Sequence, residues 1–195
     1  ALPGVKEVFE AADDTEMTVI GIAGPSLVNQ MGFYLIDEDG ILAIKCTEAT
    51  MALINLGDKV VMKGTRVHYN PEGVIGQTTL LDSVLVENLY GGHEYSTASF
   101  DSTKTVSDLY SLSVQEDYTT KAYILDVTVE VVEAAYYTNI YLHDPENYEK
   151  SVRLYCSSAN QYAWLKQYAG QTITVEIAVC NWNYKAYYAT CLLAV

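Results

Sequence analysis

Two stretches in different halves of the chain share one pattern, and this pattern constrains the fold more than any other sequence feature. The first, 32–46, reads Gly-Phe-Tyr-Leu-Ile-Asp-Glu-Asp-Gly-Ile-Leu-Ala-Ile-Lys-Cys, which predicts two short strands joined by an acidic turn. The second, 139–156, contains Asn-Ile-Tyr-Leu-His-Asp, a turn, and Val-Arg-Leu-Tyr-Cys. This duplication predicts a chain built from two similar units.

Alignment of the two copies predicts which side chains point into each unit. Side chains alternate between the two faces of a strand, so the aligned apolar residues share the inner face. We expect the following residues to point inward: Phe33, Leu35, Leu42 and Ile44 in the first copy, and Ile140, Leu142, Val152 and Leu154 in the second. We expect the following residues to point outward: Tyr34, Ala43 and Lys45, with Tyr141, Arg153 and Tyr155.

Each half of the chain follows one predicted order: helix, long strand, two short strands, helix and two more strands. The expected strands span 17–28, 32–37, 41–46, 58–69 and 74–86, then 120–133, 137–144, 151–156, 171–181 and 186–195. The expected helices span 2–12, 47–56, 105–112 and 158–169. Five strands with a helix between the third and fourth form the order of an OB fold.

This order predicts an all-β chain with short helices, folded as two tandem five-stranded OB-fold-like Greek-key barrels. We expect the first barrel over 1–90 and the second over 105–195. The polar stretch 91–104, rich in small residues, is the predicted linker.

Three motifs of the first half carry a family resemblance: Val19-Ile-Gly-Ile, Gly32-Phe-Tyr-Leu-Ile-Asp, and the run Gly-Asp-Lys-Val-Val-Met-Lys-Gly over 57–64. With them, residues 5–88 resemble the bacterial secreted OB-like modules found beside extracellular nucleases and other surface enzymes. The second half departs from these motifs, with Asn139-Ile-Tyr and Gly170-Gln171 in place of Gly-Phe-Tyr and Gly-Asp. The resemblance implies an extracellular or cell-surface bacterial protein.

The charge of the chain is strongly acidic. The formal net charge is −14, from 25 acidic and 11 basic residues. A phosphate backbone is repelled by such a surface overall, so we place nucleic acid behind other ligands. No apolar run reaches the roughly 18 residues of a membrane-spanning helix, so we expect no membrane span.

The sequence contains no recognisable catalytic set. Its histidines, His68, His93 and His143, lie in no hydrolase, kinase or zinc motif, and we interpret them as ordinary surface residues. The acidic turn 37–39 lacks the further ligands of a calcium loop, which favours a solvated turn. We therefore expect a non-enzyme with no cofactor and no bound metal.

The four cysteines, Cys46, Cys156, Cys180 and Cys191, form no CxxC pair. Two interpretations stay open. All four can be buried free thiols, or Cys180 and Cys191 can form a disulfide across the last hairpin.

A binding surface is the remaining candidate for function. OB folds bind oligonucleotides or oligosaccharides through the outer face of strands two and three and the adjoining loops. In the second unit this surface is predicted to contain Tyr141, Arg153, Tyr155, Trp182, Asn183, Tyr184 and Lys185. The alternative is that these aromatic residues pack between the two units or beneath a loop.

The leading hypothesis is a non-catalytic binding or accessory module of a secreted or cell-surface bacterial protein. It binds a carbohydrate or a protein partner through the barrel face. The alternative hypothesis is a single-stranded nucleic-acid-binding accessory domain of an extracellular nuclease. Oligomeric state is not predicted.

Overall fold

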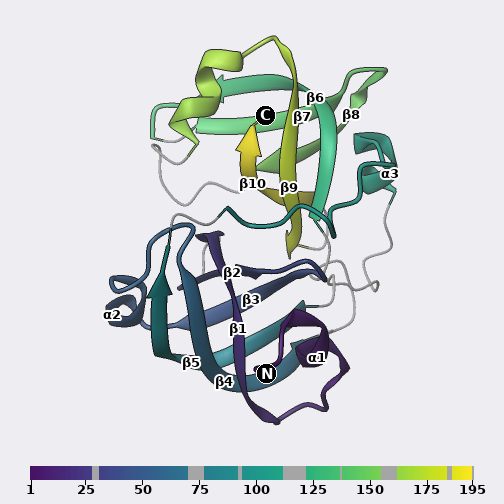
Figure 1. Ribbon diagram of the computed structural model, residues 1–195. Helices are drawn as coiled ribbons and strands as arrows, with labels where there is room; N and C mark the ends of the chain where they lie inside the picture. The colour runs from purple at the N-terminus through teal and green to yellow at the C-terminus, as the bar shows by residue number, and fades with distance from the viewer. Residues whose placement is uncertain are drawn as a thin grey trace.

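The computed structural model contains two closed five-stranded barrels, drawn one above the other in Figure 1. It describes residues 1–27, 31–69, 77–91, 94–111, 122–136, 138–154, 162–183 and 186–194, with the backbone alone described at 69, 77, 180–183, 186–190 and 193–194. Within these ranges, no helix is long and apolar enough to cross a membrane.

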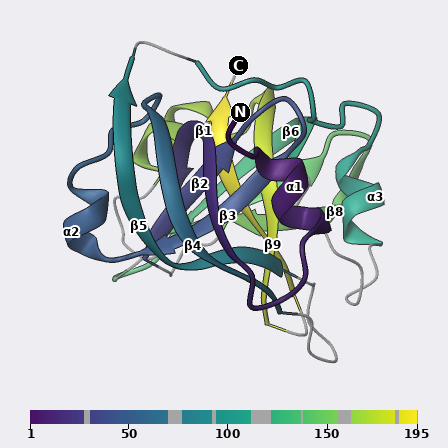
Figure 2. The same cartoon turned by 60° about the horizontal axis from the view of Figure 1, so that its bottom comes forward.

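The first barrel closes through pairing of strands that are far apart in the sequence. Its strands are β1 (Glu16–Ser26), β2 (Gly32–Ile36), β3 (Ile41–Cys46), β4 (Lys59–Tyr69) and β5 (Gln77–Tyr90). Around the barrel their order is β1-β2-β3-β5-β4, and β1 pairs with β4 to complete the circle. The pairing of β3 with β5 is parallel, and the other pairings are antiparallel. The helices are α1 (Val5–Glu10) and α2 (Glu48–Met51), which lie on opposite sides of this barrel (Figure 2).

The second barrel has the same strand order. It contains β6 (Ala122–Glu133), β7 (Thr138–Asp144), β8 (Asn147–Leu154), β9 (Thr172–Asn183) and β10 (Ala186–Ala194), arranged as β6-β7-β8-β10-β9. The helix α3 (Val106–Tyr110) precedes it. The expected fold class is therefore confirmed: the chain is mostly β, with short helices and two OB-fold-like Greek-key barrels.

One expected helix has a different form. The segment predicted as an α-helix over 158–169 contains the 3-10 helix η1 (Ala163–Tyr168), and its first four residues, 158–161, lie outside the described residues. Tyr162, which precedes η1, has a left-handed backbone with φ +60°. Short 3-10 helices are frequent in the connections between longer elements.

The two β-hairpins have equivalent registers. Tyr34 pairs with Ala43 in the first barrel, and Tyr141 pairs with Arg153 at the equivalent position of the second. The predicted inward residues of both hairpins are buried in the two barrel cores. The alignment made from the sequence therefore gives the correct inner face in both barrels.

Tyr34 and Ala43 point away from the first core, as predicted. Both are nevertheless buried, because the second barrel covers them. We call this contact the inter-barrel cluster. Its buried members are Leu27, Tyr34, Ile36, Ile41 and Ala43 of the first barrel, Phe100, and Ala122, Ala178 and Leu192 of the second. Lys45 lies at the margin and is half-buried.

The predicted linker packs between the barrels. Figure 1 shows the segment that leads to α3 running between the two units. The Asp101 amide donates to the Ala122 carbonyl at 2.9 Å, and the Ile124 amide donates to the Asp101 carbonyl at 3.0 Å. The Phe100 ring is buried, and its centroid lies 6.2 Å from that of Tyr95. The domain boundaries at 90 and 105 stay a prediction.

A buried polar pair lies beside the inter-barrel cluster. The Tyr95 hydroxyl donates to Glu176 Oε2 at 3.0 Å, and Glu176 is buried on β9. Burial raises the pKa of Glu176, and the hydrogen bond from Tyr95 offsets part of that rise. Burial and the neighbouring carboxyl of Glu176 also raise the pKa of Tyr95, which keeps its hydroxyl a donor.

We expect Glu176→Gln to stabilise the protein at neutral pH. Because the folded-state pKa of Glu176 is raised, the unfolded state ionises first, and stability falls as pH rises through the ordinary glutamate pKa of about 4.3. Glutamine does not ionise, so this loss of stability disappears. Its side-chain oxygen still accepts the hydrogen bond from the Tyr95 hydroxyl. Urea unfolding over a pH series measures this. The free energies of unfolding of the two proteins should converge in acid, and the variant should be the more stable protein above the ordinary glutamate pKa. Equal stability at neutral pH would contradict the assignment.

An aspartate holds the leading helix in each barrel. Asp37 Oδ2 accepts from the Val5 amide at 2.8 Å, and Asp144 Oδ2 accepts from the Ser107 amide at 3.0 Å and the Ser107 hydroxyl at 2.6 Å. Burial alone would raise the pKa of Asp144, but these hydrogen bonds, with others from the adjoining turn, lower it overall. The acidic turn after β2 therefore has a structural role at Asp37.

The disulfide interpretation is wrong. Cys191 forms no disulfide and lies inside the second core, opposite Ile177, whereas Cys180 lies opposite Tyr188. The two cysteines are therefore not cross-strand neighbours in the hairpin. Cys46 is also free and packs against the first core, where burial raises the pKa of its thiol. Cys156 lies outside the described residues.

Candidate ligand-binding face

The outer surface of β7 and β8 carries the predicted site. Ile140, Leu142, Val152 and Leu154 point into the core, so the residues between them face outward. We call this surface the β7–β8 face, and it consists of Asn139, Tyr141, His143, Ser151 and Arg153. Tyr141 and Arg153 are direct cross-strand partners, and both are half-buried.

The structure brings together two of the seven predicted site residues, Tyr141 and Arg153. Trp182 and Asn183 end β9, but their side chains are outside the described part of the chain. The remaining three, Tyr155, Tyr184 and Lys185, also lie outside the described residues. The contribution of these five residues stays a prediction.

The equivalent surface of the first barrel has a different chemistry. At the positions of Tyr141, His143, Ser151 and Arg153, the first barrel has Tyr34, Ile36, Ile41 and Ala43. Those four side chains are buried in the inter-barrel cluster. This face of the first barrel is therefore covered by the second barrel. For the aromatic residues of the second unit, the alternative that they pack between the units or beneath a loop stays a prediction.

A bulge in β8 brings a further tyrosine onto the β7–β8 face. His143 pairs with Ser151, but the next residue, Asp144, pairs with Asn147. Three residues of β8, 148–150, are therefore left over between the two pairings. Such a bulge redirects side chains relative to a regular strand. Here the Tyr148 ring lies over the His143 ring, with the centroids 3.7 Å apart and the planes 5° apart.

His143 is held by two hydrogen-bond partners. Its Nδ1 lies 2.6 Å from the Tyr148 carbonyl oxygen, and its Nε2 lies 3.2 Å from Glu130 Oε1 on β6. The residue is 8% exposed, so the interpretation of His143 as a surface histidine is wrong. Its alternation with the inward residues of β7 was visible in the sequence, but the covering tyrosine was not, because the bulge has no clear sequence signal.

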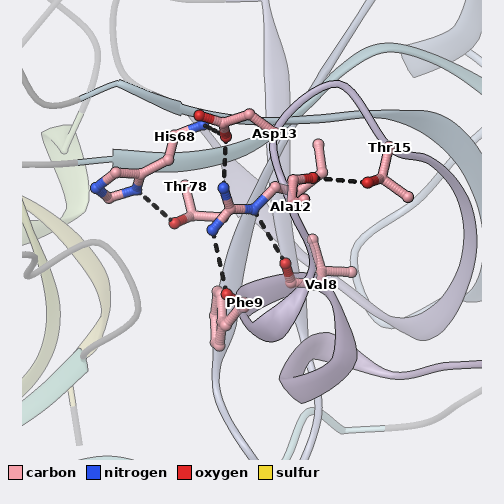
Figure 3. Close-up of polar contacts among 8 residues, drawn as sticks. Val8, Phe9, Ala12, Asp13, Thr15, His68 and Thr78 are labelled. Atoms are coloured by element: carbon pink, nitrogen blue, oxygen red, sulfur yellow. Dashed lines mark hydrogen bonds and ion pairs between the residues drawn. The ribbon is translucent and has the colours of Figure 1, made fainter.

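His68 belongs to a structural network in the first barrel. Its Nδ1 lies 2.9 Å from Thr78 Oγ1, and its amide donates to Asp13 Oδ1 at 2.8 Å. Arg66 forms an ion pair with the same carboxylate and donates to the carbonyls of Val8 and Phe9 (Figure 3). The hydrogen bond from the His68 amide, and then Arg66, lower the pKa of Asp13. These contacts fasten the end of α1 to β4. His93 lies outside the described residues.

Two exposed aromatic residues near one end of β6 were missed by the sequence analysis. Tyr136, in the turn between β6 and β7, is 91% exposed, and Trp164, on η1, is also exposed. Lys166 Nζ lies 3.2 Å from Glu133 Oε1, which ties η1 to the end of β6. The loop between the first and second strands is a ligand-binding loop of OB folds, so Tyr136 adjoins the candidate face.

A polar cleft of about 430 Å³ adjoins the β7–β8 turn. Its lining includes Lys104, Ile124, Asp126, Glu146, Thr172 and Thr174. Asp126 Oδ1 accepts from the Thr174 hydroxyl at 2.7 Å. Over the ranges that the structure describes, no three His, Cys, Asp or Glu side chains are grouped to hold a metal ion.

Comparisons with known proteins give similarity at the level of solved structures. No known protein family matches the sequence, and no curated protein matches it. A murine DNA-binding protein bound to double-stranded DNA aligns at 12% identity, covering 94% of each chain, with a TM-score of 0.41. A HINa domain in complex with 20-base-pair double-stranded DNA aligns at 12% identity, covering 93% of this chain and 96% of that chain, with a TM-score of 0.42.

A replication protein A heterotrimer bound to single-stranded DNA aligns at 11% identity. The alignment covers 100% of this chain and 69% of that chain, with a TM-score of 0.33. These scores are too low to carry an argument about function. The OB-like fold follows from the strand order of the two barrels, and the bacterial, secreted setting implied by the family resemblance stays a prediction.

Proposed function

We propose that the chain is a non-catalytic binding module that holds a single-stranded oligonucleotide on the β7–β8 face. The carrying observation is the direct pairing of Tyr141 with Arg153 across β7 and β8. A tyrosine ring stacks on a nucleobase regardless of base identity. A guanidinium beside it contacts phosphate through paired N–H groups or stacks on the same base.

The difference between the two barrels supports this choice of surface. The first barrel has apolar residues on this face, and the second barrel covers them. The second barrel has a tyrosine, a histidine, a serine and an arginine at the same positions. These polar and aromatic groups are suited to a hydrated ligand rather than to a dry internal contact.

The acidity of the chain sets the conditions under which binding is expected. With a net charge of −14, the protein as a whole repels phosphate, and only the local contacts of the face oppose that repulsion. Salt screens the repulsion as well as the attraction, so the dependence of affinity on salt should be shallower than for a basic binding protein.

An oligosaccharide is the second candidate ligand, and the net charge is the observation that favours it. A neutral sugar is not repelled by an acidic surface, and tyrosine rings also pack against sugar rings. A protein partner and an extracellular or cell-surface bacterial location belong to this second proposal, on the family resemblance alone.

We expect Tyr141→Ala and Arg153→Ala each to weaken oligonucleotide binding by about 5- to 150-fold, from about 1–3 kcal/mol per stacked base. Fluorescence anisotropy with a labelled oligothymidylate at low and physiological salt measures this. The matched control is Tyr90→Ala, because Tyr90 is 66% exposed on the first barrel and should leave affinity unchanged.

The same variants separate the two candidate ligands. An oligonucleotide that binds and responds to both substitutions supports the first proposal. An oligosaccharide panel that binds in a Tyr141-dependent manner, with no oligonucleotide binding, supports the second. If ligands bind but neither Tyr141→Ala nor Arg153→Ala alters the affinity, the β7–β8 face is not the ligand site.

A further inference from the structure

The His143 ring is held from two sides. Nδ1 lies 2.6 Å from the Tyr148 carbonyl oxygen, and Nε2 lies 3.2 Å from Glu130 Oε1. Partners on both ring nitrogens, together with the covering Tyr148 ring, fix the orientation of the imidazole.

The neighbours of the ring come from three strands. Glu130 approaches from β6, Tyr148 covers the ring from the bulge of β8, and Ser151 is the cross-strand partner. On β7 itself, the Tyr141 ring centroid lies 6.4 Å away. The following residue, Asp144, is committed to the Ser107 hydroxyl and amide.

The lysine of the bulge contacts α3. Lys150 Nζ lies 4.3 Å from the centre of the Tyr110 ring on α3, which anchors the far end of the bulge. Among the described hydrogen bonds and ion pairs, the carboxylate that contacts the imidazole ring is therefore that of Glu130.

We infer that His143 is a positioning residue that fixes the ring of Tyr148 as a third contact for the ligand, beside Tyr141 and Arg153. This inference rests on the proposed function of the β7–β8 face. Tyr148 is 53% exposed while one side of its ring lies on His143. The ring is thus held at one surface and available to a base or sugar at its other edge and face.

A double-variant comparison separates positioning from stability. His143→Gln and Tyr148→Ala should each weaken binding by about 5- to 100-fold, and the double variant should be no weaker than Tyr148→Ala, because both act through one ring. Tyr148→Phe should retain binding, because the ring and not the hydroxyl stacks on the ligand. His68→Gln, in the first barrel, is the matched control and should leave affinity unchanged. Additive losses in the double variant would overturn the inference.

A ligand-free measurement keeps the inference independent of the proposed function. Proton NMR should show the Tyr148 ring signals shifted by stacking on the His143 ring. Tyr148 signals like those of a free tyrosine refute the positioning role. If these signals are as expected and neither ligand class binds, it is the proposed function that fails.

Discussion

Ala43→Arg is expected to disrupt the contact between the two barrels. Ala43 is fully buried in the inter-barrel cluster, and it occupies the position that Arg153 has in the second barrel. An arginine there places a charge among apolar side chains. A buried charge without a partner lowers the free energy of unfolding by about 3–5 kcal/mol. We expect either two separate unfolding transitions in denaturant or loss of the folded state.

The reciprocal substitution provides the control. Arg153→Ala removes a half-exposed cation from the equivalent position, so it should leave the unfolding midpoint nearly unchanged. Chemical denaturation followed by circular dichroism measures both variants, and small-angle scattering reports on separation of the barrels. A single transition at the original midpoint for Ala43→Arg would show that the inter-barrel cluster contributes little to stability.

Gly32→Ala is expected to destabilise the first barrel severely. Gly32 begins β2 with φ +153°, a backbone conformation that favours glycine. A Cβ atom there would lie 1.9 Å from the Ile44 carbonyl oxygen, which belongs to the partner strand and cannot move aside. Backbone strain and overpacking, each about 1–3 kcal/mol, predict a loss of about 3–5 kcal/mol in the free energy of unfolding.

A second glycine separates strain from crowding. Gly170 has φ +78°, but a Cβ atom there would meet no other atom within 4 Å. Gly170→Ala should therefore cost only the left-handed backbone penalty, about 1–2 kcal/mol. Urea unfolding of the two variants gives the comparison. Equal losses would mean that the close approach of β2 to Ile44 has no energetic consequence.

Local sequence pattern was sufficient for the elements and their pairing. Alternation identified the inner residues of both hairpins. Thr47 and Thr105, a residue type favoured at helix starts, cap α2 and α3 through their side chains. These features depend on neighbours within a few residues or on the adjacent strand. The same reasoning placed Tyr141 beside Arg153, because register within a hairpin is set by its alternation.

The sequence of the first hairpin contains a signal that its outer face is covered. In the first hairpin both faces are apolar, as Phe-Tyr-Leu-Ile and Ile-Leu-Ala-Ile show, and β2 is buried along its whole length. Such runs indicate strands covered on two sides. The second hairpin interrupts the run with His143, Ser151 and Arg153, which is the pattern of a strand with one hydrated face.

Two features of the site could be found only from the folded chain. Docking of the barrels determines which OB face is covered, because Tyr34 and Ala43 meet Ala122, Ala178 and Leu192 from the other half of the chain. The β8 bulge places Tyr148 on His143 and leaves His143 against Glu130 of another strand. The residue pattern specified two barrels and their strand registers, since those follow from alternation along each strand. Long-range packing determined which of the two equivalent faces is covered, since that depends on contacts between residues that no local pattern connects.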